Sequence, residues 1–246
     1  MIRLVLLPGM DGTGQLFGPF LAALGATVDA HVVRYPPSMA SYKELVAFAA
    51  NELPTDGHYV ILGESFSGPI ATALAARRPT GLVGLVLCAT FVKNPPPRFN
   101  SLRSLVGLLP AIAPPIKPLS WLLCNEAAHS QADPLRSAIA SIPPSTLRAR
   151  LGEVLAVDAC ASLRDVSVPI LYLRALHDRL VPRDASQVIQ RIRQDVTVVD
   201  IEAPHFLLQT APKAAAAAVQ RFATAIAAAG SGVADPATAL RESPPS

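Results

Sequence analysis

Residues 63–68, with the sequence GESFSG, join a strand-like run directly to a helix-like run. Residues 58–62 before them favour β-structure, and the apolar residues of 69–78 recur at helical spacing. A strand that turns at once into a helix brings the two elements close together, so the flanking residues must be small, as Gly63, Ser67 and Gly68 are. The pattern is a variant of the nucleophile elbow, which exposes the residue at the turn, Ser65. A plain strand–loop–helix junction with a surface serine is the alternative interpretation.

This turn belongs to a longer alternation of strands and helices. The expected strands cover residues 2–7, 27–34, 58–62, 82–91, 169–174 and 196–201. The expected helices cover residues 15–24, 41–53, 69–78, 183–193 and 211–229. Alternation of this kind predicts an α/β fold, with a mostly parallel central sheet flanked by helices. We expect residues 1–92 and 161–229 to form this core.

Between residues 93 and 160 the alternation is interrupted. Prolines cluster there among short helical segments, and no run of residues resembles a strand. We expect this stretch to be a helical lid inserted into the core rather than an independent domain. Residues 230–246 are mostly Gly, Ser, Pro and Ala with scattered charges, which predicts a disordered tail.

Composition narrows the class of protein. The net charge is 21 − 18 = +3, which does not indicate the basic face of a nucleic-acid-binding protein. The cysteines Cys88, Cys124 and Cys160 are far apart and odd in number, so we expect neither a disulfide framework nor a metal site. No apolar run reaches the roughly 20 residues of a membrane span, and the first residues lack a signal-peptide core. We therefore expect a cytoplasmic protein without a metal ion, a nucleic-acid partner or a membrane insertion.

A glycine-rich loop at residues 9–14, GMDGTG, follows the first expected strand. A dinucleotide site needs the spacing G-x-G-x-x-G, but here the spacing is G-x-x-G-x-G, and the second strand ends in Arg34 instead of an acidic residue. The other interpretation is an oxyanion loop. One backbone N–H then comes from this loop and the second from the residue after the nucleophile, which assigns Met10 and Phe66 and requires no cofactor. A plain glycine turn is the third alternative.

A base and an acid are also needed, because a serine hydroxyl is a poor nucleophile until a base takes its proton and a carboxylate orients that base. Of the five histidines, His205 directly follows the last expected strand. Asp178 follows the strand that comes after residues 93–160. His177 is the competing base, but it is adjacent to this acid and is badly placed to be its partner. We therefore predict a triad of Ser65, Asp178 and His205.

With these residues in this order, residues 1–229 outside the lid resemble the α/β-hydrolase superfamily. The likeness is strongest over 158–205, where the run VPIL precedes Asp178 and Val-Pro follows it. Within the superfamily the chain is similar to small lidded carboxylesterases, including the pimeloyl-carrier-protein methyl ester esterases of biotin synthesis. The resemblance implies acyl transfer to water, in which Ser65 attacks a carbonyl, His205 carries the proton and the amides of Met10 and Phe66 bind the oxyanion.

The predicted function is therefore hydrolysis of a carboxylic ester through an acyl-enzyme on Ser65. The substrate is a small-molecule ester or an acyl methyl ester linked to a carrier protein. An acyl thioesterase is the close alternative, and a cofactor-free oxidoreductase or haloperoxidase-type activity uses the same triad. A non-catalytic ligand-binding protein of the same fold is the alternative of another class, because fold alone does not fix function.

The whole excess of positive charge lies in the expected lid. Residues 93–160 hold seven basic and four acidic side chains, 7 − 4 = +3, and the rest of the chain is neutral. An ordinary solvated surface explains this distribution, whereas docking of an acidic partner such as acyl carrier protein is the sharper hypothesis. Apolar side chains in the same stretch suit either an acyl chain or packing on the sheet: Leu102, Leu105, Leu108, Leu109, Ile112, Trp121, Leu122 and Leu123.

Overall fold

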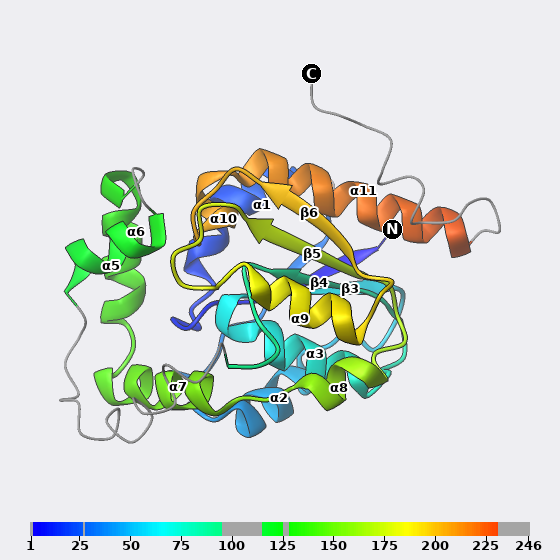
Figure 1. The fold of residues 1–246 in the computed structure, drawn as a ribbon, viewed down its shortest axis with the longest axis horizontal. Helices are drawn as coiled ribbons and strands as arrows, with labels where there is room; N and C mark the ends of the chain where they lie inside the picture. The colour runs from blue at the N-terminus through cyan, green and yellow to red at the C-terminus, as the bar shows by residue number, and fades with distance from the viewer. Residues whose placement is uncertain (1, 27, 95–114, 125–127, 231–246) are drawn as a thin grey trace.

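The structure is a computed structural model that describes residues 2–26, 28–94, 115–124 and 128–230 (Figure 1). Its six described strands form one sheet in the order β2-β1-β3-β4-β5-β6, and every neighbouring pair is parallel. The strands are β1 (Arg3–Leu7), β2 (Ala30–Val32), β3 (Tyr59–Glu64), β4 (Leu82–Cys88), β5 (Ile170–Ala175) and β6 (Thr197–Ile201). The predicted α/β fold with a mostly parallel sheet is confirmed.

Helices cover both faces of this sheet (Figure 1). One face carries α1 (Gly18–Leu24), α10 (Leu207–Thr210) and α11 (Pro212–Gly230). The other carries α2 (Tyr42–Asn51), α3 (Gly68–Ala76), α8 (Cys160–Asp165) and α9 (Asp184–Ile192). Two short 3-10 helices, η1 (Gln15–Phe17) and η2 (Ser65–Ser67), precede α1 and α3. The sheet is therefore the middle layer of three.

Side-chain alternation along β1 shows why this sheet needs cover on both faces. Val5 and Leu7 are fully buried in the cluster under α2 and α3, whereas Leu4 and Leu6 are buried in the cluster under α1 and α11. In a strand, successive side chains point to opposite faces, so an uninterrupted apolar run is stable only between two layers. Burial of each such side chain contributes about 1.5–3 kcal/mol.

Three expectations on the elements need correction. The fourth strand was expected over residues 82–91, but β4 covers only Leu82–Cys88. The second strand was expected over residues 27–34, but β2 covers only Ala30–Val32. It is the edge strand, so it can pair on one side only, and the amide of Tyr35 already turns away to the carbonyl of Gly12 at 2.8 Å. The last helix extends to Gly230, one residue into the stretch predicted to be a disordered tail. The rest of that tail, residues 231–246, lies outside the described residues.

Three helices between β4 and α8 in the chain lie beside the carboxyl end of the sheet (Figure 1). They are α5 (Ile116–Cys124), α6 (Ala128–Ala140) and α7 (Pro144–Ala156). An apolar cluster that includes Leu123, Leu135 and Ile139 joins them to Leu16 and Phe206 of the core. The apolar residues expected at 102–112 lie outside the described residues. The division into a core and a lid of residues 93–160 stays a prediction.

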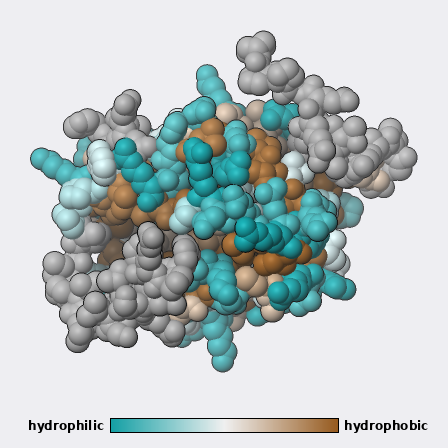
Figure 2. Space-filling view, viewed as in Figure 1, coloured by the Kyte–Doolittle hydropathy of each residue, from teal (hydrophilic) through white to brown (hydrophobic). Residues whose placement is uncertain are grey.

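In the view of Figure 2, polar and apolar residues alternate over the coloured part of the surface. No helix in the described part of the chain has both the length and the apolar character that a membrane span requires.

Candidate active site

The elbow sits at the carboxyl end of β3, and its backbone is strained. Ser65 has a φ of 49°, in the left-handed region that non-glycine residues rarely adopt. A Cβ atom at Gly63 would lie 2.7 Å from the Cβ of Ala71, and one at Gly68 would collide with Thr90. Both glycines are therefore needed for strand and helix to approach, and strain of this kind is characteristic of functional sites.

Ser67 stands where the elbow pattern usually has a second glycine, and its hydroxyl makes contacts that sequence reasoning missed. The side chain is fully buried, and Oγ donates to the carbonyl of Pro8. It also lies 2.7 Å from the hydroxyl of Tyr35, whose pKa burial raises well above its usual range. Ser67 thus ties the elbow to the loop that follows β1.

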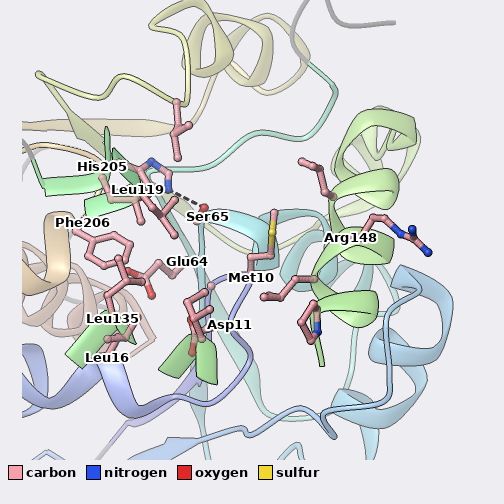
Figure 3. Close-up of a pocket in the computed structure, with 17 residues that line it drawn as sticks. Met10, Asp11, Leu16, Glu64, Ser65, Leu119, Leu135, Arg148, His205 and Phe206 are labelled. Atoms are coloured by element: carbon pink, nitrogen blue, oxygen red, sulfur yellow. Dashed lines mark hydrogen bonds between the residues drawn. The ribbon is translucent and has the colours of Figure 1, made fainter. Parts of the chain in front are cut away.

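Three predicted site residues lie in one hydrogen-bonded chain. Oγ of Ser65 is 2.8 Å from Nε2 of His205 (Figure 3). On the other side of the imidazole, Nδ1 of His205 is 2.7 Å from Oδ2 of Asp178. The His205 and Asp178 side chains are 3% and 5% exposed. Oδ1 of Asp178 accepts from the amides of Leu180 and Val181 at 2.8 and 2.9 Å, which fixes the carboxylate. A buried imidazole so held can accept the Ser65 proton and be stabilised as imidazolium.

His177, the competing base, and two further carboxylates of the chain have other roles in the structure. Nε2 of His177 lies 2.6 Å from Oε2 of Glu202, in an exposed pair. Asp184 lies in the first turn of α9, where a negative charge favours the helix. Asp158 pairs with Lys93 at 3.0 Å. Among the described residues, no group of three or more His, Cys, Asp or Glu side chains could hold a metal ion.

The two predicted oxyanion residues lie beside Ser65. Met10 follows β1 and lines the same cavity as Ser65 (Figure 3). Phe66 is the second residue of η2, where the amides at a helix start have no acceptor within the helix. The loop turns through Gly12 and Gly14, whose φ values are 72° and 69°. Met10 thus lines the cavity onto which Ser65 opens and Phe66 directly follows Ser65 in the chain, and their role as oxyanion donors stays a prediction.

A cavity of about 410 Å³ opens onto Ser65. Its polar lining includes Asp11, Glu64 and Arg148 (Figure 3). The apolar lining comes from η1, the helices α5–α7 and the residue after His205, and includes Leu16, Leu119, Leu123, Leu135, Ile139, Leu147, Leu151 and Phe206. A cavity that is mostly apolar with a few polar groups near a nucleophile can hold a small organic substrate.

Glu64 is a cavity residue that the sequence did not single out, although it directly precedes Ser65. It is 5% exposed, and its Oε1 accepts from Nε2 of Gln209 on α10 at 2.9 Å. Burial, with a smaller contribution from the negative charge of Asp11, raises the pKa of its carboxyl to about 7 against the lowering effects of Gln209, His205 and the amide of Gly9. Both charge states of this side chain are therefore accessible near neutral pH.

The sheet is parallel, and a strained serine lies at the end of β3. An aspartate follows β5 and a histidine follows β6. This arrangement is typical of the α/β-hydrolase superfamily, to which this chain belongs. More narrowly, the family described as "Serine aminopeptidase, S33" matches residues 25–207, and the chain is a member of it. Its family and fold are therefore those of the α/β-hydrolases.

One curated relative matches part of the chain. A Variovorax paradoxus (strain S110) protein named "Putative carbamate hydrolase RutD" is 32% identical over 160 residues, which cover 60% of this chain and 56% of that protein. The chain thus matches little more than half the length of this relative.

Solved structures share the fold over most of the chain. The enol-lactonase of Burkholderia xenovorans LB400 has a TM-score of 0.76 at 16% identity, covering 91% of both chains. The thermophilic esterase of Thermogutta terrifontis has a TM-score of 0.76 at 20% identity, covering 92% of this chain and 90% of its own. At these identities the likeness concerns the fold alone.

Proposed function

We propose that this protein is a serine esterase that hydrolyses a carboxylic ester through an acyl-enzyme on Ser65. The observation that carries the proposal is the continuous hydrogen-bonded chain from Ser65 through His205 to Asp178, with 2.8 and 2.7 Å between the bonded atoms. This chain ends at a mostly apolar cavity, which suits the acyl part of an ester.

The reaction follows from the positions of these groups. Oγ of Ser65 attacks the ester carbonyl carbon while Nε2 of His205 takes the hydroxyl proton. The carbonyl oxygen becomes an oxyanion, for which the amides of Met10 and Phe66 are the proposed donors. When the C–O bond breaks, His205 returns the proton to the alcohol. A water molecule then attacks the acyl-enzyme, again with His205 as base, and releases the acid.

The part of residues 93–160 that the structure describes supports a covering role. Helices α5, α6 and α7 supply Leu119, Leu123, Leu135, Ile139 and Leu147 to the cavity. We therefore retain the proposal that this stretch is a lid over an acyl-binding cavity.

Docking of an acidic carrier protein on this lid also remains a proposal. Fewer of the seven basic side chains of residues 93–160 support it than the sequence alone indicated. Arg150 is fully buried and cannot contact a partner. Arg98 and Arg103 lie outside the described residues. If docking occurs, kcat/KM for a carrier-linked ester exceeds that for the free methyl ester, and the excess falls with added salt. Equal values for both substrates would exclude it.

Four alternatives remain, one of which is the cofactor-free oxidoreductase or haloperoxidase-type activity on the same triad. A thioester fits the same mechanism with a thiolate leaving group. The named activity of the Variovorax relative makes a carbamate a second candidate substrate. A ligand-binding protein without turnover is the alternative of another class. Turnover of p-nitrophenyl esters of increasing chain length, acyl-CoA thioesters and aryl carbamates separates the substrate classes, and the proposal expects the highest kcat/KM for an ester.

Labelling with a fluorophosphonate probe tests the nucleophile directly. The wild type should be labelled and should lose esterase activity, whereas Ser65→Ala should show neither labelling nor turnover. Ser162→Ala, on α8 on the far side of α3, is the matched control and should behave as wild type. Labelling that persists in Ser65→Ala, or a wild type that is neither labelled nor active on any substrate, refutes the proposal.

A further inference from the structure

Arg150 on α7 is the largest fully buried side chain in the described part of the chain. Its guanidinium group makes five hydrogen bonds, all to main-chain carbonyl oxygens. Nη1 donates to Met10 at 2.7 Å and to Asp11 at 3.1 Å. Nε and Nη2 donate to Met39 at 3.1 and 2.8 Å, and Nη2 also reaches Pro36 at 3.4 Å. These bonds use the five N–H donors that a guanidinium group has.

Such a residue needs an explanation beyond filling space. A buried cation loses its hydration, and well-packed apolar side chains of similar volume often give equal or greater stability. Burial does lower the pKa of Arg150, against the raising effect of the Asp11 carboxylate. No salt bridge to Arg150 occurs among the described residues, so its charge is balanced mainly by carbonyl dipoles. The cost of the charge suggests that it serves the site.

Arg150 contacts both residues of the predicted oxyanion hole. It binds the carbonyl of Met10, and its guanidinium carbon lies 5.9 Å from the ring centroid of Phe66. Gly12 leaves room for it, because a Cβ atom there would lie 2.6 Å from Nη1 of Arg150. The sequence of the glycine loop thus accommodates a guanidinium group from a helix about 140 residues further along the chain.

We propose that Arg150 is a positioning residue for the oxyanion loop. By holding the carbonyls of Met10 and Asp11, it fixes the peptide that follows the Met10 amide and so orients that amide toward the reacting carbonyl. It also places a positive charge behind the loop in the protein interior. This charge stabilises the oxyanion that develops in the transition state more than it stabilises the neutral ester of the ground state. Arg150 is absent from the cavity lining, so it acts without touching the substrate. The inference rests on the proposed esterase function.

Two substitutions of Arg150 and one matched control test this inference. Arg150→Met removes the charge and all donors but keeps much of the volume, and Arg150→Lys keeps the charge without the planar set of donors. Arg193→Met is the control, because Arg193 is also mostly buried and donates to a main-chain carbonyl, that of Val166, at the opposite end of β5.

In Arg150→Met, kcat should fall by about 10- to 100-fold with KM nearly unchanged, less than the roughly 100- to 1000-fold loss on removal of a complete donor. Arg150→Lys should lie between Arg150→Met and wild type. The affinity for a trifluoromethyl ketone, which forms an oxyanion on Ser65, should fall by the same factor as kcat/KM. The affinity for the product acid should not change. Arg193→Met should lower Tm and leave kcat and both affinities at wild-type values.

Several results would overturn the proposed positioning role of Arg150. An Arg150→Met protein that folds and keeps wild-type kcat overturns the inference. If Arg150→Met fails to fold, an Arg150→Lys protein with unchanged kcat and unchanged affinity for the trifluoromethyl ketone overturns it. A loss of kcat matched by an equal loss in Arg193→Met also overturns it, because the effect is then one of general destabilisation. A wild type without esterase activity refutes the proposed function itself, and this inference falls with it.

Discussion

Asp178 is held at three points, by the amides of Leu180 and Val181 and by the imidazole of His205. In Asp178→Asn, the side-chain amide has to satisfy the two backbone donors with its oxygen, so its NH₂ group faces His205 and favours the wrong tautomer of the imidazole. We expect kcat for ester hydrolysis to fall about 10⁴-fold while the fold persists. Glu202→Gln, which alters only the exposed partner of His177, is the control and should keep wild-type kcat. A loss below tenfold in Asp178→Asn contradicts the role of Asp178.

Glu64 should make the free energy of unfolding depend on pH. In the unfolded chain a glutamate ionises near pH 4.5, whereas burial holds the proton on folded Glu64 up to about pH 7. Between these values the folded state binds more protons, so the free energy of unfolding falls as pH rises, and it levels off above pH 7. Since one pH unit corresponds to about 1.4 kcal/mol, the whole fall is about 3 kcal/mol. Asp11, His205 and Gln209 are the neighbours that modulate it.

Urea denaturation at pH 5 and pH 8 measures this fall in wild type and in Glu64→Gln. Glutamine keeps an oxygen for Gln209 but cannot ionise, so the variant should lose less stability between the two pH values than the wild type. All other titrating groups are common to both proteins and cancel in the comparison. The same change in stability for both proteins would show that Glu64 ionises as it does in the unfolded chain.

Single residues also show where sequence reasoning stops. The juxtaposition of Ser65, Asp178 and His205 could be predicted because each follows a strand that the pattern of apolar residues locates. The roles of Ser67, Glu64 and Arg150 could not, because their partners Pro8, Gln209 and Met10 are 59, 145 and 140 positions away. Such contacts depend on how the loops at one edge of the sheet meet, and local spacing carries no information on that.

Among the elements, the junction of β3 and α3 leaves little room for larger side chains. In Gly63→Ala, the new Cβ would lie 2.7 Å from both the Cβ of Ala71 and the carbonyl oxygen of Ser67. We expect a loss of about 1–3 kcal/mol in the free energy of unfolding, together with lower kcat as Ser65 is displaced. Gly152→Ala is the matched control, because nothing lies within 4 Å of a Cβ there, in the interior of α7. That variant should gain about 0.5–1 kcal/mol, and chemical denaturation measures both.

Element positions were largely predictable for a physical reason. Buried strands and amphipathic helices carry their periodicity in the local sequence, and local signals mark helix starts. Ser41 precedes α2, and its Oγ accepts from the amide of Glu44 at 3.2 Å, as a serine at a helix N-cap does. The carboxylate of Glu44 also accepts a hydrogen bond from the Ser41 hydroxyl at 2.8 Å. The short helices α8 and α10 had no such signal, since six and four residues are too few to show a period.

On the scale of the whole molecule, α5 contacts both loops that carry the predicted base and acid. The amide of Phe206, next to His205, donates to the carbonyl of Leu123 at 2.9 Å. The guanidinium group of Arg179, next to Asp178, lies 3.9 Å from the ring centroid of Trp121. The cavity is therefore bounded by the sheet edge on one side and by these helices on the other, and its volume depends on how the two parts pack.

Filling this volume should change which esters the protein hydrolyses. Leu135 on α6 is 2% exposed and lines the cavity, so Leu135→Trp should shorten the space available to an acyl chain. We expect kcat/KM for p-nitrophenyl octanoate to fall at least about tenfold, with little change for p-nitrophenyl acetate, because a hydrophobic pocket discriminates by about 1–3 kcal/mol per methylene. Ser137→Trp places the same side chain on the exposed face of α6 and should leave both values unchanged. If Leu135→Trp lowers both esters equally, the acyl chain lies elsewhere, and the cavity receives the alcohol part instead.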